Sequence, residues 1–166
     1  MEAMDAMIQL NITALTRLTC AVAPALVARG SGTIVNISSV VGIAVEMLNG
    51  VCSASKSYVL SFGHALQKDL ADKGVRVQTV LPGATATEFW DVAGYAAQKT
   101  SAITMSAADL VDAALAGLDQ GELVTIPGLQ DVADWTRWQE DRRAMAAKFG
   151  NAKPSARYGL VTANAA

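Results

Sequence analysis

Apolar residues recur at helical intervals near the start of the chain and in short uninterrupted runs further along. The first pattern predicts a helix over about 1–28, with an apolar stripe of Leu10, Ala14, Leu18, Val22 and Leu26. Pro24 lies inside this pattern and is expected to kink the helix. A glycine-rich stretch at 30–32 then ends it. The β-branched run 33–37 predicts a strand of the kind that is buried in a parallel sheet.

The alternation of helix and strand continues along the chain. A second helix is predicted over about 52–73, with an apolar stripe of Val59, Phe62, Leu66 and Leu70. Gly74 is expected to end this helix, because glycine adopts the left-handed conformation found just beyond many helix ends. Residues 75–81 form the next predicted strand, which ends at Pro82 and Gly83.

A third unit completes the pattern. Ser106 is expected to cap a helix over 107–118, with Asp109 three residues later, and a strand over 123–126 follows. Another amphipathic helix is predicted over 131–148. Strands that alternate with helices of this length favour right-handed crossovers, so the sequence predicts an α/β fold built on about three parallel strands.

Composition narrows the class of protein. The 166 residues are 52% hydrophobic and 17% charged, which is typical of one soluble globular domain. A net charge of −2 gives no basic face, so neither nucleic acid nor a membrane is expected as a partner. No positively charged leader opens the sequence and no apolar run reaches the ~20 residues that span a bilayer, so a cytoplasmic location is expected.

The two cysteines and the polar ends of the strands are the remaining candidates for chemistry. Cys20 and Cys52 have no metal-binding spacing, so no metal site is expected, and Cys20 is expected to be a buried helix residue. Cys52 and Lys56 lie four residues apart at the start of the second helix, which places them on one face. Ser39 follows the first strand, where ligands bind in open α/β sheets. Taken alone, Ser39 is more typical of the start of a loop, and Lys56 alone is more typical of a solvated side chain.

Four segments together resemble the C-terminal portion of the short-chain dehydrogenase/reductase family, from about 9 to 158. They are the segment that ends in Asn11, the strand end that carries Ser39, the helix start with Lys56, and the run Pro82, Gly83, Ala84, Thr85, Ala86 and Thr87. The resemblance implies part of a Rossmann-like, doubly wound parallel sheet. It also implies NAD or NADP as cofactor and a small alcohol or carbonyl compound as substrate.

The resemblance assigns a role to each matching residue. Asn11 would help to hold a water connected to Lys56, and Ser39 would hydrogen-bond the substrate oxygen. Lys56 would contact the nicotinamide ribose. The segment with Pro82, Gly83, Thr85 and Thr87 would bind the nicotinamide carboxamide.

Cys52 stands where the family has its proton-donating tyrosine. A phenol beside the Lys56 ammonium would have a lowered pKa and would exchange protons near neutral pH. With bonds of about 1.5 Å, a cysteine sulfur lies about 3 Å from its Cα, and a tyrosine oxygen reaches about twice as far. Geometry therefore argues against Cys52 as a direct substitute, and activity is expected to be impaired.

A second departure concerns the cofactor phosphates. No G-x-G-x-x-G turn occurs, so the dinucleotide phosphate-binding half of the resembled fold has no counterpart. Residues 1–160 are therefore expected to be the C-terminal part of such a domain, with 161–166 as a flexible tail. One edge of the strand 33–37 would lack a partner, which indicates either a truncated form of a longer protein or an edge covered by assembly.

Two functions follow from these observations. The first is nicotinamide-dependent interconversion of an alcohol and a carbonyl. The alternative is an inactive fragment that acts as an oligomerisation or interaction module, with the helices 1–28 and 52–73 packing against a second copy. A lipophilic substrate is one interpretation of the apolar residues near the site, and core packing is the other: Val40, Val41, Ile43, Met47, Leu48, Phe89 and Trp90.

Overall fold

The computed structural model describes residues 1–48 and 50–160. The chain divides into two compact units, Met1–Gly128 and Leu129–Ala166, which are described separately below. The predicted flexible tail, 161–166, lies outside the described residues.

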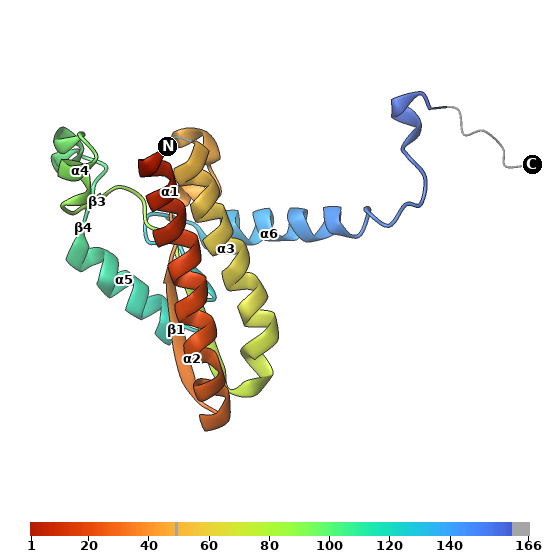
Figure 1. Cartoon of the computed structure of the whole chain (residues 1–166), viewed down its shortest axis with the longest axis horizontal. Helices are drawn as coiled ribbons and strands as arrows, with labels where there is room; N and C mark the ends of the chain where they lie inside the picture. Colours follow the sequence, from red (N-terminus) through yellow and green to blue (C-terminus); the bar gives the residue numbers. More distant parts are fainter. Residues whose placement is uncertain (49, 161–166) are drawn as a thin grey trace, which may run out of the picture. The chain divides into compact units, whose positions relative to one another are not determined.

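Three parallel strands form the centre of the first unit, in the order β1-β2-β5. Figure 1 labels the first of them, β1, beside α2. The strands are β1 (Gly32–Ile37), β2 (Val75–Val80) and β5 (Val124–Thr125). β1 and β2 pair along their whole length, from Gly32 opposite Val75 to Ile37 opposite Val80. β2 is buried along most of its length, whereas β1 alternates buried and exposed residues and leaves Val35 and Ile37 exposed. The strand predicted over 33–37 is therefore present, but it is covered on one face only, and its expected burial is wrong for the other face. The predicted α/β class with a parallel sheet is confirmed.

The sequence did not predict a second, smaller sheet. In this second sheet, β3 (Thr85–Ala86) pairs in parallel with β4 (Met105–Ser106). Between these strands lie the short helix α4 (Phe89–Val92) and a 3₁₀ segment, Ala96–Thr100. Strands of two residues are too short to show an alternating pattern, so periodicity gives no signal for them.

The first predicted helix is interrupted, but not at Pro24. It comprises α1 (Glu2–Ile8), a π-helical segment over Gln9–Ala14, and α2 (Leu15–Arg29), and Pro24 lies within α2. The departure from α-helical geometry therefore lies near Asn11. π-type turns are frequent at functional sites.

Most of the apolar stripe predicted for this helix does not face the core. Leu10, Leu18 and Val22 are exposed, whereas Leu26 packs against the hydrophobic core. Cys20 is also exposed, so its predicted burial is wrong. Spacing shows which residues share one face of a helix, but it does not show whether another element packs on that face.

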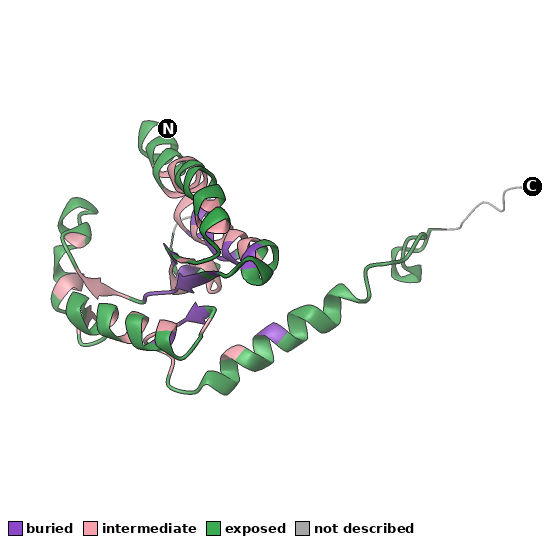
Figure 2. Ribbon diagram, turned by 90° about the horizontal axis from the view of Figure 1, so that it is seen from below, coloured by how far each residue is buried: buried purple, intermediate pink, exposed green. Residues whose placement is uncertain are grey.

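Helix α3 (Gly50–Leu70) packs on β2 and is followed by a 3₁₀ turn, Ala71–Lys73. Gly74 has a φ of +73°, as predicted for the residue that ends the helix. In the first unit, the residues coloured as buried lie mainly in the strands and in α3 (Figure 2). The core cluster beneath α2 and α3 consists of Ile34, Leu70, Val75 and Val77.

Helix α5 (Ala107–Asp119) covers β5 in the first unit. The Ser106 side chain accepts a hydrogen bond from the Asp109 N–H at 3.0 Å, which confirms the predicted cap. Gln78 of β2 ties this helix to the sheet, because its Nε2 donates to Ala114 O and to Thr125 Oγ1, both at 2.8 Å.

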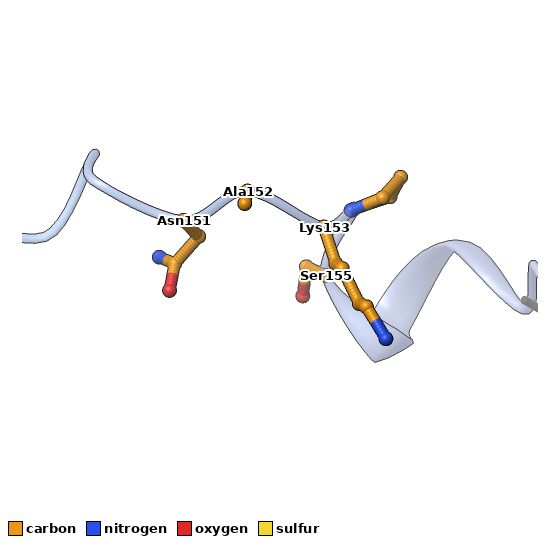
Figure 3. Close-up of a pocket in the computed structure, with 5 residues that line it drawn as sticks. Asn151, Ala152, Lys153 and Ser155 are labelled. Atoms are coloured by element: carbon orange, nitrogen blue, oxygen red, sulfur yellow. The ribbon is translucent and has the colours of Figure 1, made fainter.

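The second unit contains helix α6 (Val132–Ala146), capped by Asp131, and a 3₁₀ turn over Ala156–Tyr158. The rings of Trp135 and Trp138 stack within α6 with centroids 5.0 Å apart. A shallow hollow lies along the consecutive residues 151–155 (Figure 3). All five of these residues are exposed, so this segment encloses no ligand site.

The continuous helical stretch Glu2–Arg29 is long and apolar enough to cross a membrane by length and composition alone. The expectation that no stretch reaches this length is therefore wrong on this criterion. A core helix or a signal sequence near an N-terminus satisfies the same criterion, so a single such helix is only a weak indication.

Candidate active site

Ser39 lies at the carboxyl end of β1, where it caps a short 3₁₀ turn, Val40–Gly42. Its Oγ donates to Pro82 O at 3.2 Å and accepts from the Val41 N–H at 3.3 Å. The Val40 N–H donates to the same Pro82 carbonyl at 2.9 Å. The ends of β1 and β2 are thereby joined, and Ser39 sits beside the segment that begins at Pro82.

Lys56 reaches the same edge of the sheet from the second turn of α3. Its Nζ donates to Ile37 O at 3.2 Å, two residues before Ser39. Backbone groups alternate in direction along a strand. Ser38, directly after β1, donates its N–H to Val80 O, so the even-numbered residues of β1 also direct their backbone groups toward β2. Ile37 O therefore faces the open edge of β1, and the ammonium lies at that edge.

Burial lowers the pKa of Lys56 below its ordinary value of 10.5, and the nearby Cys52 opposes this by favouring the charged amine. Cys52 is half-buried in the first turn of α3, one helical turn before Lys56. The two side chains are close enough to interact electrostatically. A cysteine four residues before a lysine therefore does lie on the same helix face.

Asn11 projects from the π-helical segment toward α3. Its Nδ2 donates to Ser55 Oγ at 3.0 Å, and Ser55 Oγ donates in turn to Cys52 O at 2.8 Å. One turn further along, Thr16 Oγ1 and Tyr58 Oη lie 2.8 Å apart. Two polar contacts thus hold the first helix against the start of α3. Tyr58 is engaged here with α2.

The segment after β2 borders the site on its other side. Pro82 is buried, and Gly83 is exposed with open space where a Cβ would lie. Thr85 Oγ1 donates to Gly83 O at 3.2 Å, and Thr87 is exposed. The Trp90 indole N–H donates to Thr85 O at 2.7 Å, which holds α4 against β3.

The apolar residues expected near the site differ in burial. Val41 is buried, whereas Met47, Leu48 and Phe89 are exposed. Phe89 and Trp90 contact each other edge to face, with ring centroids 5.2 Å apart. Exposed apolar side chains therefore occur on both segments that follow the strand ends, 40–48 after β1 and 82–90 after β2.

Three serines in contact with the site elements were not among the residues predicted from the sequence. Ser38, Ser55 and Ser57 each donate to a backbone carbonyl of a neighbouring or the same element. The signal that could have found them is the density of serine on either side of Ser39 and Lys56. Within the described residues, no group of three His, Cys, Asp or Glu side chains is placed to hold a metal ion.

The short chain dehydrogenase family matches residues 1–100 of this chain. An uncharacterized oxidoreductase of Staphylococcus saprophyticus is 34% identical over 125 residues, which are 75% of this chain and 52% of that protein. The chain spans about half the length, or less, of the curated relatives it matches.

Solved structures agree with this match. A short-chain dehydrogenase from Sphingobium yanoikuyae in complex with NADPH has a TM-score of 0.90 and 44% identity, over 95% of this chain and 61% of that one. The bulky-bulky ketone specific alcohol dehydrogenase of Comamonas testosteroni has a TM-score of 0.83 and 38% identity, over 95% and 59% of the two chains. The chain belongs to the short chain dehydrogenase family.

Proposed function

We propose that this chain carries the substrate-handling half of an NAD(P)-dependent oxidoreductase that interconverts an alcohol and a carbonyl compound. The observation that carries the proposal is the hydrogen bond from Lys56 Nζ to Ile37 O. It puts an ammonium at the carboxyl edge of the sheet, two residues from Ser39, where ligands of open α/β sheets bind. We further propose that residues 1–160 form the C-terminal part of a single domain of this family. The match of the Sphingobium structure to 95% of this chain supports this proposal.

Each site residue has a role in this reaction. The Ser39 hydroxyl orients the substrate oxygen, and Lys56 binds the ribose hydroxyls and supplies positive charge. Asn11 anchors a water that leads to Lys56. Thr85 and Thr87 bind the carboxamide beside the open space at Gly83. The bound nicotinamide supplies the hydride-transfer chemistry.

The donor set fits the nicotinamide and ribose end of the cofactor. Lys56 offers N–H donors at the sheet edge, and the backbone after β2 is accessible at Gly83. No glycine-rich turn for the phosphates occurs in the sequence. We therefore expect weak cofactor binding by this chain alone.

Cys52 makes this chain a poor proton donor. Its sulfur ends about 3 Å from its Cα, so it falls short of a substrate oxygen placed for a phenol. General acid-base catalysis contributes about 10²- to 10⁴-fold to a rate. We expect turnover to be reduced by a factor within that range relative to a Cys52→Tyr variant.

A lipophilic carbonyl compound is the proposed substrate class. The exposed apolar side chains of Met47, Leu48 and Phe89 support it, since they lie on the segments that follow the strand ends. The name of the Comamonas relative, which is specific for bulky-bulky ketones, is consistent with such a substrate.

The test compares this chain with its Cys52→Tyr and Lys56→Met variants. Titration with NADPH, followed by the fluorescence of the reduced nicotinamide, should show binding that Lys56→Met weakens at least tenfold. Turnover of aromatic ketones should rise by about two orders of magnitude in Cys52→Tyr. Absence of NADPH binding in all three, together with unchanged turnover, would defeat the proposal.

The chain is also proposed to associate with a second copy through its long helices and to reside in the cytoplasm. Exposed Leu10, Leu18 and Val22 on the first helix support association, because such apolar stripes mark interaction surfaces. Light scattering should show a dimer or larger species that Leu18→Lys dissociates. A dimer without NADPH binding would favour the alternative, an inactive assembly module.

A further inference from the structure

Two serines join the turn that carries Ser39 to the helix that carries Lys56. Ser38 Oγ donates to Lys56 O at 2.7 Å. In the opposite direction, Ser57 Oγ lies 2.9 Å from Gly42 O and 3.0 Å from Ser53 O, and these two carbonyls share its single O–H proton. One bond thus runs from the turn to the helix, and the other runs from the helix to the turn.

Gly42 allows the two backbones to touch. A Cβ at this position would lie 2.9 Å from Lys56 O and 3.2 Å from Ser38 Oγ. Ser38 Oγ belongs to a side chain that can rotate, but the Lys56 carbonyl is backbone, so a Cβ here forces either the turn or α3 to move. The approach of the turn to the Lys56 carbonyl therefore depends on a residue without a side chain.

The placement of these residues along the chain ties the contacts to the site. Ser38 immediately precedes Ser39, and Ser57 immediately follows Lys56. The side chain of Ser39 itself hydrogen-bonds Pro82 O and the Val41 N–H, both of which lie outside α3. The link between the two site residues runs through their neighbours.

We propose that Ser38, Gly42 and Ser57 are positioning residues that set the spacing between the Ser39 hydroxyl and the Lys56 ammonium. This inference rests on the proposed function. Displacement of a reacting group by about 1 Å can cost about 100-fold in rate. The three residues act through the backbone, and none of them touches substrate or cofactor.

The test uses the full chain and a readout that does not need activity. The midpoint of Lys56 acetylation against pH, measured by competitive labelling and mass spectrometry, reports how far the amine is shielded from water. Ser38→Ala and Ser57→Ala should each raise this midpoint by about 0.5 pH unit or more, because a loosened junction admits water to the ammonium. Ser57→Thr keeps the hydroxyl and should restore the original midpoint. Ser61→Ala, an exposed serine on the same helix, is the matched control.

A purely structural role gives a different result. If the unfolding midpoint falls while the Lys56 labelling midpoint stays fixed in both alanine variants, the proposal is wrong. Ser38 is buried and Ser57 is half-buried, so Ser57→Ala is the milder substitution. If Ser38→Ala does not fold, Ser57→Ala alone decides the test. In the Cys52→Tyr background, kcat should fall tenfold or more in Ser57→Ala while the KM for NADPH changes little. If Cys52→Tyr by itself showed no activity, the proposed function would be contradicted, and the labelling result would still decide the positioning role.

Discussion

Two regions of the first unit border the same edge of the sheet and differ sharply in how they are held. The junction between β1, the following 3₁₀ turn and the start of α3 is buried and hydrogen-bonded between elements, and Ser38 there is 2% exposed. The segment from β3 to β4, residues 85–106, is largely open, and it includes Val92 at 89% and Ile103 at 77% exposed.

The difference matches the division of labour expected in an enzyme. Groups that handle protons need fixed positions, which rigid elements provide, whereas substrate contacts are commonly made by loops that can adapt. The open segment is tied mainly to itself, by the Trp90 bond to Thr85 O and by the ion pair of Lys99 with Asp91 at 2.7 Å. Changes in the buried junction should therefore affect the whole unit, and changes in the open segment should remain local.

The largest effect is expected from Gly63→Ala in the middle of α3. A Cβ at Gly63 would lie 2.0 Å from Thr79 Oγ1 of β2, so the buried Thr79 side chain must leave its position or helix and sheet must separate. Overpacking of this kind costs about 2–3 kcal/mol of unfolding free energy, measured by urea denaturation.

Two matched variants test the reason for that loss. Gly50→Ala lies in the same helix, where a Cβ would meet nothing within 4 Å, and it should leave stability nearly unchanged. Thr79→Ala removes the obstructing oxygen and should recover much of the stability in the double variant. An equally unstable double variant would contradict the steric explanation.

The next effect is expected at Gln78, which connects the sheet to α5 and thereby to the end of the open segment. Gln78→Leu removes the donor to Ala114 O and Thr125 Oγ1 in a buried setting. Leaving buried acceptors unpaired costs about 1–3 kcal/mol. The exposed Gln120→Leu should change the urea midpoint little, and equal losses in both variants would show that the Gln78 bonds contribute nothing specific.

Sequence reasoning succeeded where a pattern repeats and failed where a partner decides the outcome. The strand at 33–37, the end of α3 at Gly74 and the cap at Ser106 were predictable, because periodicity and local hydrogen-bonding chemistry determine them. Cys20 was predicted buried and is exposed, because spacing identifies a helix face but not whether another element covers it.

The site shows the same limit. The positions of Ser39 and Lys56 at one sheet edge follow from topology, since carboxyl ends of parallel strands share that edge. The contacts made by Ser38 and Ser57 depend on two backbones that meet across 15 to 18 residues of sequence separation. The density of serine near Ser39 and Lys56 indicates candidate residues, but no local pattern encodes which backbone carbonyl each serine meets.

A smaller and local effect is expected from Trp90→Phe in the open segment. The substitution keeps an aromatic ring but removes the N–H that donates to Thr85 O at 2.7 Å. A net loss of about 0.5–1.5 kcal/mol is typical for one hydrogen bond. Hydrogen exchange of residues 85–106 should accelerate several-fold while the global urea midpoint stays nearly constant. Faster exchange throughout the first unit would show that the two regions are coupled after all.

The smallest effect is expected from the pH dependence that Lys56 adds to the buried junction. Burial lowers its pKa in the folded state below the ordinary 10.5, so the unfolded chain binds more protons in the interval between the two values. The cost of the buried charge is fully present below that interval, and stability therefore rises as pH increases through it.

Comparison with Lys56→Met isolates this contribution from other groups that titrate in the same range. The difference in unfolding free energy between the native chain and the variant, measured from about pH 8 to about pH 11, should move in favour of the native chain as pH rises and then level off near the ordinary lysine pKa. A difference that is flat with pH would mean that solvent reaches the ammonium freely. Lys56 would then belong with the open segment, and the contrast between the two regions would fail at the residue on which the proposed function depends.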